Sequence, residues 1–188
     1  MKKYIRKYGF YLLCVVFLIA YFKLFCTAEV NGLSMYPTLN NEDFLLLRRT
    51  ENIQRGDIVG IYSDTLQQVI CKRIIGLPND TVEIIGNQVT VNGVVIDEPY
   101  IVEEWDSYDK HLVPENCLYV LGDNRNDSTD SRMLGCISID NMYGVLLFNI
   151  TEMFGTTRHD MLIGLILIWI LIFLFSISRK LFGRKDEV

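Results

Sequence analysis

The chain has 188 residues, a length typical of one globular domain with short additional segments, and 50% of its residues are hydrophobic. Its mean hydropathy is +0.22 and its formal net charge is −5, a composition that excludes a disordered chain, a collagen and a coiled coil. Residues 27–160 hold 21 acidic and 9 basic side chains, whereas the two ends together hold 9 basic and 2 acidic ones. An acidic middle between basic, apolar ends argues against a nucleic-acid-binding protein and is typical of a membrane protein with an outer domain.

The first predicted element is a membrane span near the N-terminus. Residues 8–22 carry no charge, and beyond Lys23, whose long side chain can reach the interface, residues 24–28 extend the apolar stretch. We therefore expect residues 1–28 to form a cytoplasmic basic tail and a transmembrane helix. A cleaved secretory signal ending at Ala28 is the alternative interpretation.

A second apolar stretch lies near the C-terminus. Residues 161–178 carry no charge and nearly cross a hydrocarbon core of about 30 Å as a helix. Basic residues precede the first stretch and follow the second, and such flanks mark the cytoplasmic side of a membrane. The sequence therefore predicts cytoplasmic tails at both ends, the second of them residues 179–188, and an extracytoplasmic domain formed by residues 29–160.

The outer domain is predicted to be one antiparallel β domain, because short apolar runs alternate with Gly, Asn, Asp and Pro. Asn92-Gly93 is the strongest hairpin signal, typical of a type I′ turn, and Gly86-Asn87 indicates a second turn just before it. The runs are Phe44–Leu47, Asp57–Tyr62, Val69–Ile75, Val82–Ile85, Gln88–Val91, Val94–Ile96, Cys117–Leu121 and Gly144–Ile150.

The cysteines predict no metal centre. Cys71, Cys117 and Cys136 lie in the outer domain and have no zinc-ligand spacing. A Cys117–Cys136 disulfide is one possibility, and small buried hydrophobic residues are the other. We expect neither a metal nor a cofactor.

Two segments together indicate a serine nucleophile with a lysine base. Ser34 lies in a loop with Gly32 before it and Pro37 after it, a rigid setting in which a hydroxyl can be displayed. Lys72 follows Ile70 and precedes Ile74 at the spacing of one strand face, so its amine interrupts an otherwise apolar surface. A buried lysine is costly unless it is neutral or paired, and the neutral amine is the form that acts as a base. The alternative places Lys72 in solvent and Ser34 in an ordinary turn.

A third polar segment, residues 121–132, combines acids, arginines and hydroxyl groups. It superficially resembles a calcium-binding loop, but Arg125 and Ser128 occupy positions where such a loop needs a ligand and a glycine. We interpret the segment as a hydrogen-bonded scaffold that braces a site.

Four motifs follow one another along the outer domain, namely Ser34–Leu39, Arg55–Val59, Lys72–Pro78 and Gly122–Arg132. Their order and spacing resemble those of bacterial type I signal peptidases over residues 30–148. This resemblance implies a mostly β peptidase anchored at the bacterial cytoplasmic membrane, which removes signal peptides from exported preproteins with a Ser/Lys dyad. The segment between Asp80 and Leu118 is too short for the large second domain of Gram-negative members and is similar in length to that of the small Gram-positive form.

Carried over by position, the resemblance implies that Ser34 is the nucleophile, Lys72 the general base and Ser128 a hydroxyl that orients the lysine amine. The backbone N–H of Ser34 would help to stabilise the oxyanion. Further supporting positions are Arg73, Asp123, Arg125, Asp130 and Arg132.

The implied substrate is a secreted preprotein that adds as a β-strand beside the Ser34 loop and the Lys72 strand, at the surface of the lipid bilayer. Shallow pockets for small side chains are expected to be lined by Val30, Met35, Ile70 and Cys71. We expect a monomer that binds no nucleic acid. The alternative functions are a peptidase dedicated to one substrate and a non-catalytic relative that takes part in pilus or conjugation assembly.

Overall fold

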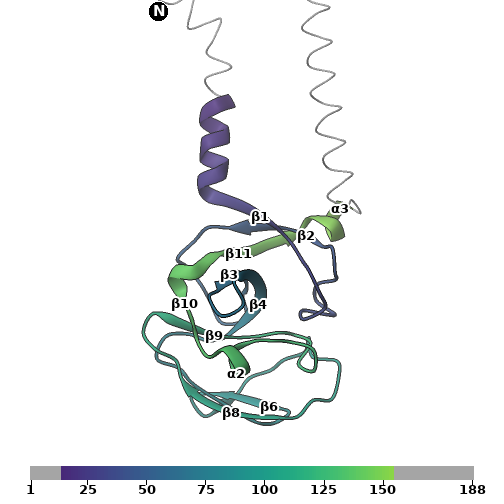
Figure 1. Cartoon of the computed structure of the whole chain (residues 1–188), viewed down its shortest axis with the longest axis vertical. Coiled ribbons are helices and arrows are strands. Elements are labelled where there is room, and N and C mark those ends of the chain that lie inside the picture. The colour runs from purple at the N-terminus through teal and green to yellow at the C-terminus, as the bar shows by residue number, and fades with distance from the viewer. Residues whose placement is uncertain (1–13, 155–188) are drawn as a thin grey trace, which may run out of the picture.

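The computed structural model describes residues 14–154, which form one helix over residues 14–24 followed by two antiparallel sheets (Figure 1). Short helical segments, α2 (Ser131–Leu134), the 3₁₀ turn η1 (Ile139–Asn141) and α3 (Ile150–Phe154), lie between or after the last strands. The strands are β1 (Phe25–Glu29), β2 (Phe44–Arg48), β3 (Ile58–Ser63), β4 (Gln68–Gly76), β5 (Thr81–Gly86), β6 (Gln88–Val91), β7 (Val94–Val95), β8 (Ser107–Leu112), β9 (Cys117–Leu121), β10 (Ile137–Ser138) and β11 (Met142–Asn149).

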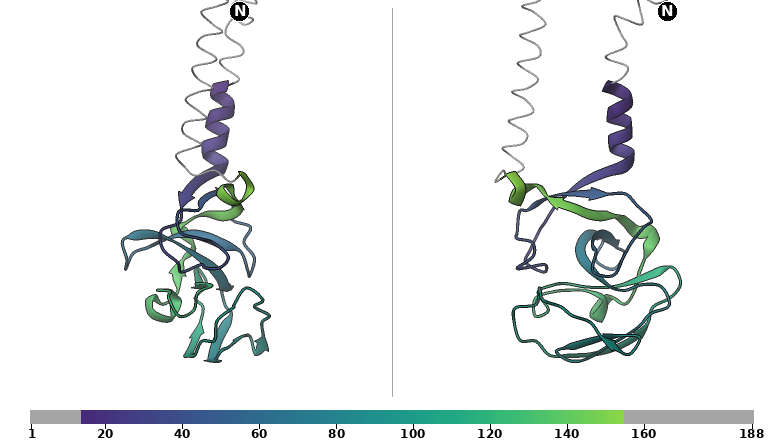
Figure 2. Two further views of the ribbon diagram at one scale, coloured as in Figure 1. Left: turned by 90° about the vertical axis from the view of Figure 1, so that its right-hand side faces the viewer. Right: turned by 180° about the vertical axis from the view of Figure 1, so that it is seen from behind.

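The larger sheet has seven strands in the order β1-β2-β11-β3-β4-β9-β10, and the smaller has four in the order β7-β6-β5-β8. Each strand pair is antiparallel, so the prediction of a mainly β, antiparallel fold is confirmed. Strands β1, β2 and β11 lie next to the helix, and the smaller sheet lies at the opposite end of the domain (Figures 1 and 2).

Three apolar clusters fill the domain, and the first of them joins the two sheets. In that cluster Tyr119 and Leu121 of β9 pack with Val82 and Ile84 of β5, and all four are almost fully buried. A second cluster packs around Val59, Ile61 and Ile74 between β3, β4 and β9. The third lies beneath the loop after β1 and contains Val30, Met35, Leu39, Leu45, Leu47 and Ile58.

The predicted turns occur where expected. Asn92 and Gly93 connect β6 to β7 with φ values of +54° and +79°, the combination that a type I′ turn requires. Gly86 has a φ of +64° in the two-residue connection between Ile85 and Gln88.

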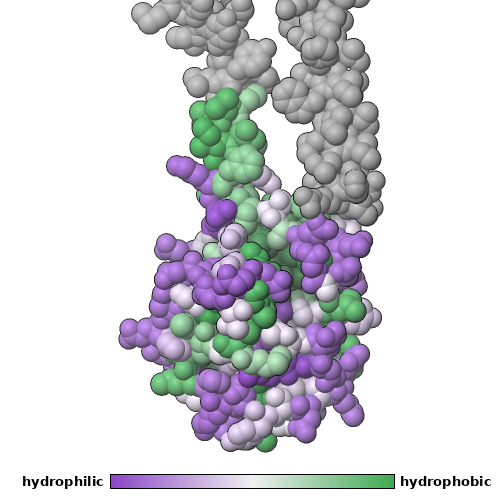
Figure 3. Space-filling model, in the orientation of Figure 1, coloured by the Kyte–Doolittle hydropathy of each residue, from purple (hydrophilic) through white to green (hydrophobic). Residues whose placement is uncertain are grey.

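The N-terminal helix ends earlier than predicted. We expected it to continue through residues 24–28, but β1 begins at Phe25 and pairs with β2 along its whole length. The backbone of β1 therefore pairs with β2 instead of forming helical hydrogen bonds. Its side chains Cys26 and Ala28 pack against the third apolar cluster. Figure 3 shows the surface of the helix over residues 14–24 as mostly hydrophobic, with a hydrophilic patch where the helix meets the domain.

Between residues 14 and 154 no helix is both long enough and apolar enough to span a membrane. The first predicted span lies only partly within the described residues. The second, over residues 161–178, lies outside them, as does the basic tail over residues 179–188.

All five cysteines belong to the described residues and are free thiols. Cys117 and Cys136 are partly buried and pack against the first cluster. Of the two possibilities that the sequence left open, the structure has small partly buried residues rather than a disulfide.

Candidate active site

A cleft of about 760 Å³ lies on the helix-proximal side of the domain. Its walls come from β1, the loop after it, and β4 with the turn that precedes it, and both Ser34 and Lys72 line it. Additional lining residues come from β2, β3 and β11, together with Asp127 and Thr129 from the loop after β9. The structure therefore brings the two predicted catalytic side chains into one cleft.

Ser34 is held in place by backbone hydrogen bonds in its loop. The Gly32 N–H donates to Asn41 Oδ1 at 2.8 Å, and the Tyr36 N–H donates to the Leu33 carbonyl at 3.0 Å. On the other side, the Asn124 N–H donates to the Ser34 carbonyl at 3.1 Å and ties this loop to the segment after β9. The Ser34 N–H itself donates to no acceptor within residues 14–154, so it is available for a substrate.

Lys72 reaches Ser34 from the neighbouring strand β4. Its Nζ donates to Ser34 Oγ at 2.6 Å and to the Cys71 carbonyl at 3.0 Å. The strand alternates as predicted, with Ile70, Lys72 and Ile74 all buried on one face, and the Lys72 side chain is only 3% exposed. Since no carboxylate forms an ion pair with this amine in the described part of the chain, its positive charge is poorly compensated.

Burial lowers the pKa of the Lys72 amine below its ordinary value, although the charges of Cys71, Asp130 and Asp123 act in the opposite direction. Burial also raises the pKa of the adjacent Cys71 thiol to about 12, so Cys71 is a neutral lining group. An amine with a lowered pKa is the species that removes a proton from a serine hydroxyl.

Neither histidine takes this place. His111 lies on β8 in the smaller sheet, where its Nε2 contacts Asp109 at 2.9 Å. His159 lies outside the described residues.

Ser128 lies beside Ser34 and forms no hydrogen bond with the lysine amine. The Ser128 side chain is 8% exposed and its Oγ has no hydrogen-bond partner, so the expected Ser128–Lys72 hydrogen bond is not formed. Gly122 allows Ser128 and the Ser34 loop to approach each other closely. A Cβ on Gly122 would lie 2.2 Å from Ser128 Oγ and 2.4 Å from the Ser34 carbonyl oxygen. Only glycine at position 122 allows this packing.

Asp123 and Arg73 form a buried ion pair behind the dyad. Arg73 Nε donates to Asp123 Oδ1 at 2.8 Å, and Arg73 Nη1 donates to the Gly56 carbonyl at 2.8 Å. The Thr38 hydroxyl donates to the same aspartate through a short hydrogen bond. This pair therefore connects the strand of Lys72 with the loop of Ser34 and with the segment after β9.

Arg125, Asp130 and Arg132 brace that segment from within. Asp130 is fully buried, accepts a hydrogen bond from the Gly122 N–H at 3.0 Å and pairs with Arg132 Nε at 2.9 Å. Arg132 Nη2 donates to the Arg125 carbonyl at 2.8 Å, and Arg125 Nε donates to the Gly122 carbonyl at 2.9 Å. The predicted scaffold is thus a single hydrogen-bonded unit around Gly122.

Three of the four predicted pocket residues line the cleft. Val30, Ile70 and Cys71 contribute to its walls. Met35 does not: it is fully buried and packs into the cluster beneath the loop. The residue after Ser34 points into the core because it anchors the loop, so the prediction for Met35 is wrong.

Sequence reasoning missed several residues that complete the scaffold. Glu98 pairs with Arg125, Tyr100 stacks on Arg73 with the guanidinium 3.9 Å from the ring centroid, and Trp105 lies 4.8 Å from Arg125. All three come from the segment between β7 and β8. The nearest signal was the density of acidic and aromatic residues in that segment.

Comparison with known proteins gives a consistent result. The model of the family described as signal peptidase, peptidase S26, matches residues 1–151. The chain is 38% identical to signal peptidase I S of Bacillus subtilis over 72% of its length and 76% of the relative's, and 37% identical to signal peptidase I of Bacillus amyloliquefaciens over 63% and 70%. A crystal structure of a signal peptidase I from Enterococcus faecalis is 33% identical with a TM-score of 0.49, over 52% of this chain and 99% of that one.

The chain belongs to the signal peptidase family, peptidase S26. The resemblance inferred from the four motifs is confirmed, and so is the enzyme class, a signal peptidase I. The roles of individual side chains stay predictions.

Proposed function

We propose that this protein is a membrane-bound serine endopeptidase that removes signal peptides from secreted preproteins, with Ser34 as nucleophile and Lys72 as general base. The observation that carries the proposal is the 2.6 Å contact between Lys72 Nζ and Ser34 Oγ, made by a lysine that is only 3% exposed. Such a distance is within the range needed for direct proton transfer.

In the first step, the neutral Lys72 amine accepts the hydroxyl proton while Ser34 Oγ attacks the scissile carbonyl carbon. The ammonium then gives this proton to the amino group of the mature protein, which departs. The signal peptide stays attached to Ser34 as an ester. In the second step, Lys72 removes a proton from water and the hydroxide attacks the ester carbonyl. The lysine ammonium then returns a proton to Ser34 Oγ, and the signal peptide leaves with a free carboxylate. The Ser34 N–H, which has no acceptor within the described residues, stabilises the oxyanion.

Two unpaired strand edges support the binding of an extended substrate. In residues 14–154, β1 pairs only with β2, and β4 pairs with β9 only from Arg73 onward. Both unpaired edges line the cleft, and an extended peptide can add to such an edge through its main chain. Val30, Ile70 and Cys71 then bound the pockets for the substrate's small side chains.

The remaining predicted site residues act by positioning. The Arg73–Asp123 pair fixes the strand of Lys72 relative to the Ser34 loop. Arg125, Asp130 and Arg132 hold the Gly122 backbone, and with it Ser128, against Ser34. The unpartnered Ser128 hydroxyl orients the lysine amine once a substrate is bound.

The charge pattern supports a membrane location for this site. In this proposal residues 1–24 include a cytoplasmic tail and the first span, residues 161–178 are the second span, and residues 179–188 return to the cytoplasm. The catalytic domain, which begins with β1 at Phe25 and extends to residue 160, then faces outward at the cytoplasmic membrane of a bacterium, where secreted preproteins emerge.

The test is cleavage of a preprotein by the purified full chain in detergent, followed by gel electrophoresis and mass spectrometry. Ser34→Ala and Lys72→Ala should each abolish cleavage and leave the thermal unfolding of the domain cooperative. Because the two groups act as one unit, the double variant should lose no more activity than either single variant.

Ser107→Ala and Lys110→Ala, on β8 of the smaller sheet, are the matched controls and should retain full activity. Activity in Ser34→Ala would contradict the proposal, and an inactive wild type would favour the non-catalytic alternative.

A further inference from the structure

Asp127 is a charged wall of the cleft that the catalytic steps do not use. The charged side chains that line the cleft are Glu29, Lys72 and Asp127. Asp127 is exposed, and its carboxylate forms no ion pair with any described residue. While Lys72 is a neutral amine, the Asp127 carboxylate is therefore an uncompensated negative charge on the wall of the cleft.

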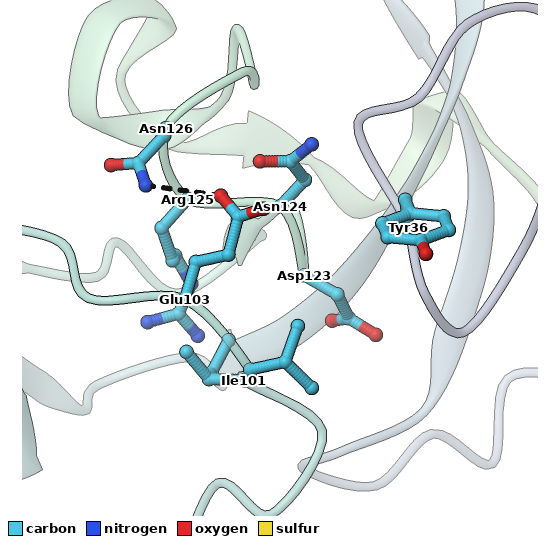
Figure 4. A pocket seen from close by; sticks show the side chains of 8 residues that line it. Tyr36, Ile101, Glu103, Asp123, Asn124, Arg125 and Asn126 are labelled. Atoms are coloured by element: carbon cyan, nitrogen blue, oxygen red, sulfur yellow. Dashed lines mark hydrogen bonds between the residues drawn. The ribbon is translucent and has the colours of Figure 1, made fainter.

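Hydrogen bonds hold the backbone of the loop that carries Asp127. The Asp127 N–H donates to the Asn124 carbonyl at 3.2 Å, and Asn126 Nδ2 donates to the Glu104 carbonyl at 3.0 Å. Asn126 also contacts Glu103, as Figure 4 shows beside a hollow of about 10 Å³. The Asp127 carboxylate is therefore presented by an ordered loop.

The loop also has a definite place relative to the nucleophile. Asn124, three residues before Asp127, donates its N–H to the Ser34 carbonyl, and Ser128, the next residue, packs against Gly122 beside Ser34. In the proposed function, the residues before the scissile bond lie along the unpaired edges of β1 and β4, which line the cleft. The wall formed by Asp127 and Thr129 is then left for the residues after it.

We infer that Asp127 is a specificity-determining residue, which favours a lysine or arginine among the first residues that follow the scissile bond. This inference rests on the proposed function. The attraction acts between an exposed carboxylate and a substrate cation across water, so it is modest and weakened by salt. A preference of about threefold in kcat/KM at low ionic strength is the expected size.

The experiment uses peptides that share one signal-peptide segment and carry Ala, Lys or Glu at each of the first three positions after the bond. The full chain in a nonionic detergent should cleave the best-placed Lys peptide about three times faster than the Ala peptide, and the Glu peptide more slowly still. Raising the salt concentration to about 0.5 M should remove most of the difference, because the screening length falls to a few ångströms.

Three variants make the assignment specific. Asp127→Asn should abolish the charge preference, and Asp127→Lys should reverse it in favour of the Glu peptide. Asp97→Asn, an exposed aspartate outside the cleft, is the matched control and should retain the wild-type preference.

The results separate this inference from the proposed function. Equal cleavage of all peptides by the wild type would overturn the role of Asp127 and leave the peptidase assignment standing. A preference that survives in Asp127→Asn, or that occurs only at positions before the bond, would overturn it too. Cleavage of no peptide by the wild type would overturn both. Should Asp127→Asn fail to fold, the loss of the wild-type preference at high salt still tests the inference.

Discussion

Lys72 carries an amine in surroundings that stabilise its neutral form. Its neighbours along the strand face, Ile70 and Ile74, are buried and apolar, and its two hydrogen bonds go to uncharged oxygens. Burial therefore lowers its pKa despite the nearby acids. An isolated lysine is almost wholly protonated at neutral pH, so this environment determines whether a base is present.

The pH dependence of cleavage should reveal this amine. Below the pKa of Lys72 in the free enzyme, kcat/KM should rise about tenfold per pH unit, and it should then level off at a pH below the ordinary range of lysine. Initial rates with a short peptide between about pH 5 and 10 measure this profile. Lys72→Arg should be inactive throughout, because a guanidinium stays protonated. A flat profile, or substantial activity in Lys72→Arg, would exclude a lysine base.

At the residue scale, the reacting groups were predictable from the sequence and their supports were not. A lysine at the position of an apolar residue in a strand is an anomaly that the residue pattern exposes, and the motif spacing identified Ser34. Glu98 and Tyr100 are contributed by a segment whose position relative to Arg125 and Arg73 follows only from the tertiary structure. Met35 was misplaced because a loop residue beside a nucleophile can point either way.

The β6–β7 hairpin is an element whose stability depends on its turn. Asn92 adopts a φ of +54°, and its side chain accepts from the Thr81 N–H at 2.9 Å and donates to Asp80 at 2.7 Å. Asn92→Ala should lower the free energy of unfolding by about 2 kcal/mol, because alanine disfavours this conformation and both hydrogen bonds are lost.

Urea denaturation of the full chain in detergent, followed by tryptophan fluorescence, measures the effect of Asn92→Ala. Asn92→Gly retains the backbone conformation and should cost about half as much, which separates the two contributions. Cleavage by both folded variants should equal that of the wild type, since the hairpin lies in the smaller sheet and does not line the cleft. Unchanged stability in Asn92→Ala would show that neither the conformation nor the hydrogen bonds of Asn92 stabilise the hairpin.

At the scale of elements, the strands with alternating or continuous apolar residues were predicted, whereas β1, β8 and the two-residue β10 were missed. Strand β8 has the sequence Ser-Tyr-Asp-Lys-His-Leu, and its exposed residues alternate with partly buried ones that are mostly polar. Pairing with β5 stabilises it, a contribution that local hydrophobicity does not report. Strand β1 was assigned to the membrane span because an apolar edge strand and the end of an apolar helix have the same composition.

For the whole molecule, the distribution of charge predicts one orientation in the membrane. In a variant whose native cysteines are replaced, a single cysteine introduced as Asp97→Cys should react with a membrane-impermeant maleimide in intact spheroplasts. A cysteine introduced as Lys3→Cys should react only after lysis, because the basic tail stays in the cytoplasm. Mass spectrometry or gel shift of the labelled chain measures both. Labelling of Lys3→Cys in intact spheroplasts would contradict the predicted topology.

The helix over residues 14–24 passes into β1 without an intervening loop, and β1 is itself a wall of the cleft. In the proposed topology the helix lies in the bilayer, and its direct continuation into β1 would set the height of Ser34 above the membrane surface. We then expect hydrolysis only where the preprotein's own anchoring helix ends at a matching distance from the scissile bond. Substrate choice would thus depend on the length of the segment between bilayer and cleavage point, as well as on the side chains that fill the pockets.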